Sequence, residues 1–428
     1  MFKKYIQKRL EKYVRKYFKR HQTVKLVVVA GSVGKTSAKM AIATVLADRF
    51  RVRLKVNSRS SVFSAPLAIL GIDYPKNAQS LSAWLAVFSA ARRRIQRPTD
   101  VDVIIQELNS SYPGQLAHLA NYMKPDMAII TAISSKDIEV FGSIDAVAKE
   151  NLSLANFSHQ AIINRDDIDS TYAKYITNSN IVTYGTSGVA EYKFITEDFS
   201  IKDGYKGVFI TPDQSEPIPV NIKVVGDHSL HPVIAAGVVA TKLGLPPGEI
   251  ATGLTRIKSV PGRMNLLRGV KNSFIIDDSY DSNPLSARSA LQALYQLSAP
   301  QKIAVLGSMS NLGITSIDEH KTLGQFCSPE ELAWVVTVGQ EANTYLALAA
   351  KTHGCQVKSF TNTLEAGAFI NSVLEPNAIV LFKGSKNGVF LEEAIKVILY
   401  STTDETKLVR QSSSWLAKKR DLFSSFSS

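Results

Sequence analysis

The chain has very little cysteine, and long apolar runs are missing from it. Its 428 residues include two cysteines, Cys327 and Cys355, which are too few for a disulfide framework or a cysteine-based zinc site. No apolar run reaches the roughly 18 residues that a membrane-spanning helix needs, and no secretory signal peptide is recognisable. We therefore expect a protein of the reducing cytoplasm that is long enough for two or three domains.

Acidic residues are also scarce, because 50 Lys and Arg stand against 37 Asp and Glu, a net charge of +13. Residues 1–20 alone hold nine Lys or Arg and one acidic residue, Glu11. Apolar residues recur there at helical spacing, which predicts a basic amphipathic helix over residues 1–22. It could lie on a membrane, bind nucleic acid, or dock on the body of the protein. Lysine mixed with tyrosine and phenylalanine favours an anionic membrane surface over nucleic acid.

A glycine-containing loop follows the first strong strand signal. The apolar run 26–30 leads into seven residues, namely Gly31, Ser32, Val33, Gly34, Lys35, Thr36 and Ser37. Glycines let backbone N–H groups approach an oxyanion, and a helix N-terminus adds partial positive charge. The lysine can reach the β- and γ-phosphates, and the threonine hydroxyl can ligate Mg²⁺. The loop is a shortened phosphate loop, since Val29 stands where the general pattern has its first glycine.

Strand and helix signals alternate along most of the chain. Between residues 23 and 225, apolar runs at 25–30, 101–108, 127–133 and 161–164 alternate with amphipathic segments, a pattern typical of a parallel sheet with helical crossovers. Short alternating runs from 191 to 225 predict a small antiparallel addition. We therefore predict an α/β protein with a central P-loop parallel-sheet domain. A Rossmann-like C-terminal α/β domain is expected at 226–405, with a frayed, serine-rich tail at 406–428.

A carboxylate marks the end of the second of these strands. Glu107 closes the apolar run 101–108. In an open parallel sheet, ligands bind beyond the carboxyl ends of the strands, so Glu107 is expected near the phosphate loop. A carboxylate there is well placed to hold Mg²⁺.

Further short motifs follow in a fixed order. They are Tyr112-Pro113-Gly114, Lys124-Pro125-Asp126, Phe141-Gly142-Ser143, Val260-Pro261-Gly262-Arg263, the stretch DDSYDSNP at 277–284, Val305-Leu306-Gly307 before Met309, and Lys383-Gly384-Ser385. Together with the shortened loop, they resemble the motifs of the Mur ligase family, most closely those of its UDP-N-acetylmuramoyl-tripeptide–D-alanyl-D-alanine ligase branch. The resemblance runs from about residue 24 to 395.

The resemblance implies an ATP-dependent ligase that joins a carboxylate to an amine. In that family the γ-phosphoryl group passes to the carboxylate, and the amine then displaces phosphate, a good leaving group. ATP and Mg²⁺ are the implied cofactors. The implied substrate is a small molecule or peptide, with an amino acid or dipeptide added to a cell-wall precursor. A poly-amino-acid or lipid-linked precursor ligase, and a non-catalytic nucleotide-binding scaffold, stay open as alternatives.

The resemblance also implies a role for each matched residue. The nucleotide would lie against residues 31–37, Asp278 and Asn283. The implied catalytic residues are Lys35, Glu107, His228 and Arg263, the substrate-facing residues are Lys383 and Ser385, and the metal ligands are Thr36, Glu107 and Asp137.

The chain departs from the family pattern at several positions. The family carries a uridine-nucleotide-binding domain before the phosphate loop, where this sequence has the basic helix. Asp137 stands in place of a metal-binding histidine, and Asn151 in place of a carbamylated lysine. Ser229 and Pro232 replace two asparagines, and Ser308 replaces an aspartate. We expect Asp137 to act as a Mg²⁺ ligand, because carboxylate oxygen suits a hard cation better than imidazole nitrogen does.

Overall fold

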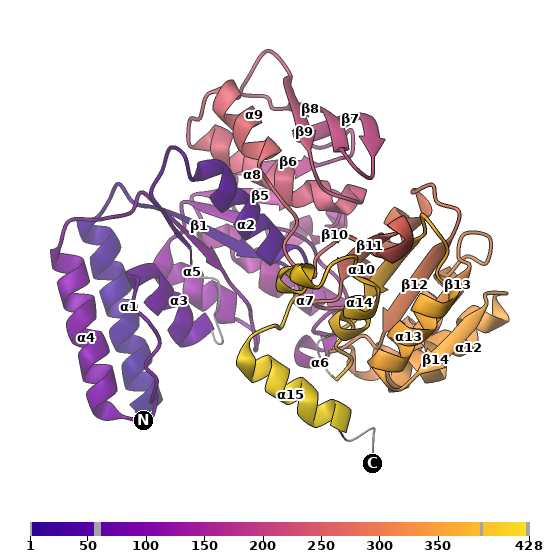
Figure 1. Cartoon of the computed structure of the whole chain (residues 1–428). Coiled ribbons are helices and arrows are strands. Elements are labelled where there is room, and N and C mark those ends of the chain that lie inside the picture. The colour runs from indigo at the N-terminus through magenta and orange to yellow at the C-terminus, as the bar shows by residue number, and fades with distance from the viewer. Residues whose placement is uncertain (1, 55–60, 386–387, 425–428) are drawn as a thin grey trace.

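Two sheets organise the chain, as the computed structural model in Figure 1 shows for residues 2–54, 61–385 and 388–424. Within these residues the first sheet has nine strands in the spatial order β2-β3-β1-β4-β5-β6-β7-β8-β9. They are β1 (Lys25–Ala30), β2 (Val52–Leu54), β3 (Val103–Glu107), β4 (Met127–Ile130), β5 (Gln160–Asn164), β6 (Ile181–Gly185), β7 (Tyr192–Ser200), β8 (Gly204–Ile210) and β9 (Ile218–Ile222).

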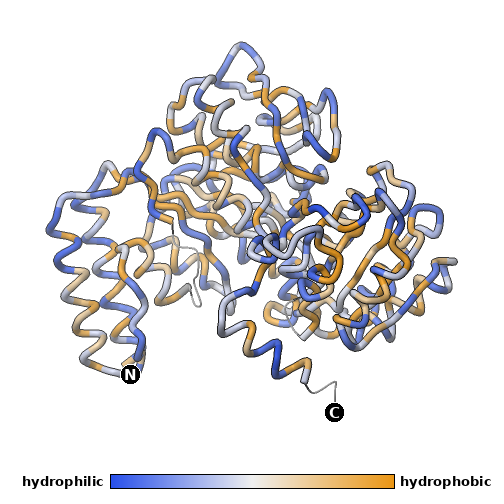
Figure 2. Tube along the Cα trace, viewed as in Figure 1, coloured by the Kyte–Doolittle hydropathy of each residue, from blue (hydrophilic) through white to orange (hydrophobic). Residues whose placement is uncertain are grey.

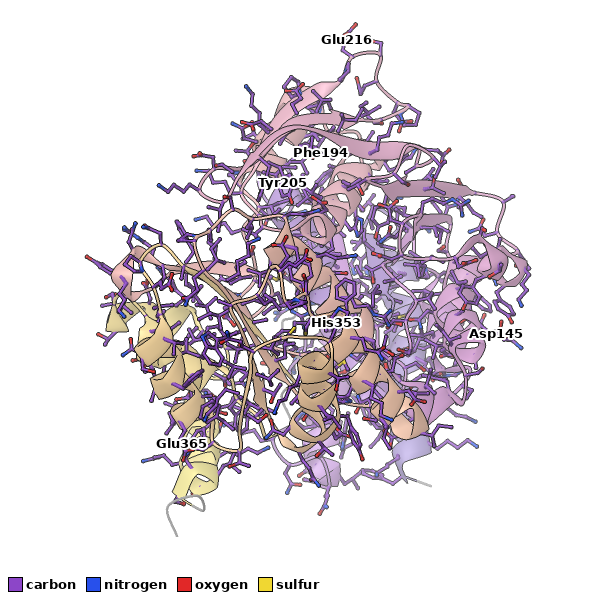
Figure 3. All side chains as sticks on the ribbon, turned by 90° about the vertical axis from the view of Figure 1, so that its right-hand side faces the viewer. Asp145, Phe194, Tyr205, Glu216, His353 and Glu365 are labelled. Carbon is purple, nitrogen blue, oxygen red and sulfur yellow. The ribbon has the colours of Figure 1, made fainter. Side chains whose placement is uncertain are left out.

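The first sheet is parallel from β2 to β7 and antiparallel from β7 to β9. This confirms the predicted parallel sheet and its antiparallel addition, which continues the same sheet. Figure 3 shows Glu216 at the tip of the addition, in the turn that joins β8 to β9, with Phe194 and Tyr205 below it. The carboxyl ends of β1, β3, β4, β5 and β6 lie along one edge, where ligands bind in such sheets.

Helices cover both faces of the first sheet. The apolar side chains of β1 point to both faces, and each set is buried under helices. Leu26 and Val28 belong to one core, and Val27 and Val29 to the other. The first core contains residues of α1 (Phe2–Arg20), α3 (Ser61–Leu70), α4 (Leu81–Gln96), α5 (Gln115–Met123) and α7 (Ile144–Ser153). The second contains residues of α2 (Lys35–Leu46), α8 (Leu230–Lys242) and α9 (Pro247–Thr255).

Helices α8 and α9 follow Gly226, the expected start of the second domain, but they pack in the core of the first sheet. Helix α8 is apolar on most of its surface, and such a helix is stable only when it is surrounded by other elements. It packs against α2 and the first sheet. Ile257 still belongs to that core, whereas Met264 belongs to the core of the second sheet. We therefore place the boundary between these two residues.

The second sheet has the spatial order β10-β11-β15-β12-β13-β14, and β10 is its antiparallel edge strand. Its helices cover both faces, as expected of a Rossmann-like domain. The strands are β10 (Asn265–Arg268), β11 (Phe274–Asp278), β12 (Lys302–Gly307), β13 (Trp334–Val338), β14 (Val357–Phe360) and β15 (Ile379–Lys383). The helices are α10 (Pro284–Tyr295), α11 (Ser316–Phe326), α12 (Ala347–Thr352), α13 (Thr363–Val373) and α14 (Glu392–Ile398).

Helix α1 is docked on the body of the protein. Its apolar stripe is buried against α3, α4 and α5, and Figure 2 shows hydrophilic and hydrophobic residues alternating along it. The buried residues are Ile6, Leu10, Tyr13, Val14 and Tyr17. The stripe is therefore not available for insertion into lipid, contrary to the simplest form of the membrane interpretation. No described helix combines the length and the apolar character needed to cross a bilayer.

The C-terminal tail is more ordered than we expected from its serine content. Residues Ser413–Ser424 form helix α15, and Lys419 in it is buried. Its ammonium pairs with Glu392 and Glu393 at the start of α14. The expectation of a frayed tail is therefore wrong for this segment, because long-range ion pairs hold it.

Candidate active site

The phosphate loop follows β1 and ends at the first turn of α2. Gly31 and Gly34 both have positive φ, +134° and +80°, a region that residues with a side chain seldom adopt. A Cβ on Gly31 would lie 2.2 Å from Thr131 Oγ1, so the tight packing of the loop against the residues that follow β4 requires glycine. Two glycines with positive φ directly before a helix N-terminus are typical of an anion-binding loop.

Lys35 lies half-buried at the head of α2. Its ammonium donates to the carbonyl oxygens of Gly31 and Ser32. Burial and the nearby charge of Lys136 lower the pKa of Lys35 to about 8, although Glu107 and Asp137 act in the opposite direction. An anion bound in the loop would restore full positive charge at this position.

Thr36 and Glu107 lie together because β3 is the neighbour of β1. Thr36 Oγ1 donates to Glu107 Oε2 at 3.0 Å, and Lys39 Nζ lies 3.0 Å from the same oxygen. Burial raises the pKa of the Glu107 carboxyl, but Lys39 and Lys35 outweigh it and the pKa is lowered. An ionised carboxylate beside a hydroxyl is a donor set that fits a hard cation such as Mg²⁺.

Asp137 lies at the start of α6 (Ile138–Phe141) with a left-handed φ of 69°. It is close enough to the loop to raise the pKa values of Lys35 and Lys136. Asn311 of the second domain approaches its Oδ1 at 3.5 Å. In the described ranges, no three His, Cys, Asp or Glu side chains converge on one point, and the role of Asp137 in metal binding stays a prediction.

Arg263 reaches from the second domain to the phosphate loop. Its Nη2 donates to Thr36 Oγ1 at 3.2 Å. Its guanidinium lies 4.3 Å above the ring centre of Tyr280. The ring face attracts this cation electrostatically. Lys35, Thr36 and Arg263 therefore meet at one place although they come from two domains.

The last two residues of β11 are Asp277 and Asp278. Asp277 is buried and accepts hydrogen bonds from the N–H groups of Gly262 and Ser279, and burial raises its pKa to about 6. Asp278 accepts from the N–H of Met264 and pairs with Lys383 at 3.1 Å. The two carboxylates thus hold the backbone on either side of Arg263.

The residues expected to face the substrate are enclosed. Lys383 is 2% exposed, and its ammonium also contacts the carbonyl oxygen of Asp281. Ser385 is equally buried. Asn283 is engaged as the N-cap of α10, accepting from the N–H of Ser286. Substrate contacts by Lys383 and Ser385, and a nucleotide contact by Asn283, stay predictions.

His228 lies in the segment that joins the antiparallel strands to α8. Burial lowers its pKa, with Asp278 acting in the opposite direction, so the imidazole is neutral at neutral pH. His231, three residues later, binds Asp166 and Asp167 at 2.9 Å each. This second histidine therefore ties α8 to the loop after β5.

Sequence reasoning missed several residues of the site. Lys136 follows β4 at the ligand-binding edge and pairs with Asp281 at 2.7 Å, so the strand-end rule applied to Glu107 could also have found it. Lys39 lies one turn after Lys35 on the same helix.

Asn151 donates within α7 to the carbonyl of Val147, whereas the neighbouring Glu150 binds the N-terminal turn of α5.

Two family domains account for most of the chain. The Mur ligase middle domain matches residues 29–240, and the glutamate ligase domain of the Mur ligases matches residues 262–386. The chain belongs to the Mur ligase family. The two matches leave residues 241–261 between them.

Similar proteins point to one branch of this family. The chain is 24% identical to UDP-N-acetylmuramoyl-tripeptide–D-alanyl-D-alanine ligase of Bacillus subtilis, over 88% of this chain and 76% of that protein. It is 27% identical to the Synechocystis protein of the same name, over 88% and 75%. The MurF ligase of Thermotoga maritima, solved in complex with ADP, superposes with a TM-score of 0.72 at 20% identity, over 91% and 83%.

Proposed function

We propose that this Mur ligase joins an amino acid or dipeptide to the carboxylate of a cell-wall precursor, using ATP and an acyl-phosphate intermediate. The observation that carries the proposal is the hydrogen bond from Arg263 of the second domain to Thr36, the residue after Lys35 in the phosphate loop. A scaffold that only binds nucleotide needs no arginine from a second domain at its phosphate loop. The relatives, which are named as ligases that use D-alanyl-D-alanine, favour a dipeptide as the amine.

Some residues of the site would bind the nucleotide, and others would neutralise charge during phosphoryl transfer. The N–H groups of the loop and the Lys35 ammonium would hold the phosphates of ATP. Arg263 would stabilise the charge that develops on the phosphoryl group as it moves to the substrate carboxylate. Thr36 and Glu107 would hold Mg²⁺, which when bound supplies further positive charge at the phosphates. His228, neutral and adjacent to Asp278, would line the junction between the domains.

Product analysis tests this function. The chain would be incubated with ATP, MgCl₂ and a panel of precursor peptides and amines, and products identified by mass spectrometry. We expect phosphate release only when carboxylate and amine are both present, together with a product heavier by the amine less water. Lys35→Ala is the matched control and should form none. Nucleotide binding without turnover on the whole panel would support the scaffold alternative.

We also propose that the chain works in the cytoplasm against an anionic membrane surface, which it contacts with the outer side of α1 and α4. The two helices lie side by side, with their C-terminal ends joined by the bond from Arg20 to the carbonyl of Gln96. Eight cationic side chains of α1 are exposed: Lys3, Lys4, Lys8, Lys12, Arg15, Lys16, Lys19 and Arg20. Each such charge adds about 1 kcal/mol near an anionic surface before screening.

Apolar side chains project near the other end of this pair of helices. Phe2 and Tyr5 of α1, and Leu81 and Leu85 of α4, are between 38% and 58% exposed. Tyr5 lies against Phe88 of α4, which places the N-terminal parts of the helices together. Exposed aromatic and leucine side chains beside lysines are the composition of a membrane-surface contact. This contact leaves the buried stripe of α1 in place.

A further inference from the structure

A buried ionic cluster connects the end of the chain to the second domain. Glu392, the first residue of α14, is fully buried, and its carboxylate accepts from Arg410 Nε at 2.7 Å. Lys419 Nζ lies 2.8 Å from Glu392 and 2.6 Å from Glu393. Buried charges are stable only when they are paired and hydrogen-bonded. The position of Arg410 is therefore strongly determined by the Glu392 carboxylate.

The other side of the Arg410 guanidinium holds the loop after β11. Its Nη1 donates to the carbonyl oxygen of Tyr280 at 3.1 Å, and its Nη2 to that of Ser279 at 2.8 Å. A guanidinium presents its N–H groups in a rigid fork, so it can satisfy a carboxylate on one edge and carbonyl oxygens on another. Lysine has the charge but not this geometry. Arg410 also has a φ of +56°, a conformation that side-chain-bearing residues adopt at a conformational cost.

The loop held by Arg410 is the one that supports Arg263. Tyr280, whose carbonyl Arg410 binds, places its ring under the Arg263 guanidinium. A Cβ on Gly262 would lie 2.6 Å from Val409 Cγ1, so the residue before Arg410 packs on the residue before Arg263. One continuous set of contacts therefore runs from α14 through Arg410 and Tyr280 to Arg263 and Thr36.

We propose that Arg410 is a positioning residue for the ligase reaction, and that it sets the place of Arg263 at the phosphate loop by fixing the 279–280 backbone. This inference rests on the proposed function. It assigns the C-terminal segment 408–419 a part in nucleotide binding, although no residue of that segment contacts Thr36 or Lys35 in the described residues.

The test is a double-mutant cycle on binding of a fluorescent ADP analogue with MgCl₂, which needs no ligase activity. We expect Arg410→Met and Arg410→Lys each to weaken binding at least fivefold, and Arg263→Met to weaken it at least tenfold. The double variant Arg410→Met/Arg263→Met should bind within twofold of Arg263→Met alone, because Arg410 acts through Arg263. Lys418→Met removes an exposed cation of α15 and should bind like the wild type.

Thermal unfolding of each variant separates positioning from folding. Arg410→Lys keeps a cation beside Glu392, so it should unfold close to the wild type while it still binds weakly. Wild-type affinity in Arg410→Lys, or fully additive losses in the double variant, would overturn the inference. A wild-type chain that binds no ADP analogue would instead overturn the proposed function and the inference together.

Discussion

Lys136 Nζ lies 2.7 Å from Asp281 Oδ2, and this ion pair joins the loop after β4 to the loop after β11. Burial lowers the pKa of Lys136, but Asp281 outweighs it and the pKa is raised. The charged Lys136 in turn lowers the pKa of Lys35. A lysine that pairs across the two domains therefore contributes, after burial, to the lowered pKa of Lys35 in the phosphate loop.

The first prediction concerns the pH dependence of nucleotide binding. With a pKa of about 8, the Lys35 ammonium is charged below pH 8 and loses its proton above it. A bound phosphate favours the charged form, so binding above pH 8 requires proton uptake. We expect the affinity for ADP to be constant from pH 6.5 to 7.5 and then to fall, by up to about tenfold per pH unit. Titrations from pH 6.5 to 9.5 measure this. Lys35→Arg should abolish the fall, since its guanidinium stays charged.

The second prediction concerns the effect of the Lys136–Asp281 pair on the pH at which the affinity for ADP begins to fall. Lys136→Met removes the cation that lowers the Lys35 pKa, so the fall in affinity should begin at higher pH. Asp281→Asn keeps the cation and removes its partner, and should give no upward shift. Identical pH profiles for Lys136→Met and the wild type would contradict the electrostatic coupling of Lys136 to Lys35.

The third prediction concerns Asp137 as a Mg²⁺ ligand. Asp137→Asn removes one charged oxygen donor near the loop, and the Mg²⁺ concentration for half-maximal ATP turnover should rise several-fold. Glu107→Gln is the comparison and should show at least as large a shift, because Glu107 contacts Thr36 directly. An unchanged Mg²⁺ requirement in Asp137→Asn would reject the ligand role.

The fourth prediction concerns stability rather than activity. Burial lowers the pKa of His231, but its hydrogen bonds to Asp166 and Asp167 outweigh it and raise the pKa to about 9. The resulting stability is fully present below the unfolded pKa of about 6.5 and is lost as pH rises through 9. A pKa shift of this size corresponds to about 3 kcal/mol in the free energy of unfolding. Urea unfolding should show His231→Gln destabilised by up to that amount at pH 6, with the difference shrinking by pH 9.5.

The fifth prediction concerns the outer side of α1. Deleting residues 1–20 would uncover the core beneath α1, so substitutions on the exposed side are the sharper test. Glutamine at four lysines should lower binding to phosphatidylglycerol vesicles on the order of tenfold or more, and salt should lower wild-type binding. The four are Lys3, Lys4, Lys8 and Lys12.

A matched control variant loses the same four positive charges at the other end of the first domain. Glutamine replaces Lys202, Lys206, Lys223 and Lys258, all of which are exposed. This variant should sediment with vesicles like the wild type. Equal losses in the two variants would mean that net charge alone is responsible, and would reject a specific surface on α1.

The sequence by itself determined the features that depend on neighbouring residues. The phosphate loop is such a feature, because a strand, two glycines and a helix start lie within a dozen residues, and the backbone requirement for glycine is local. The alternation of strands and helices, and hence the α/β class, also comes from short-range periodicity. For the same reason α1 could be predicted as amphipathic.

Only the tertiary structure decided what those elements contact. Periodicity shows that α1 has an apolar stripe but cannot say whether lipid or the protein's own core covers it, and the structure places α3, α4 and α5 there. Lys136 and Asp281 are 145 positions apart, and Arg410 is 130 positions from Tyr280. Pairs at such separations are brought together by the order of strands in two sheets and by the docking of the tail. No local pattern encodes that arrangement, because each residue alone is an ordinary polar side chain at the end of a strand or in a loop.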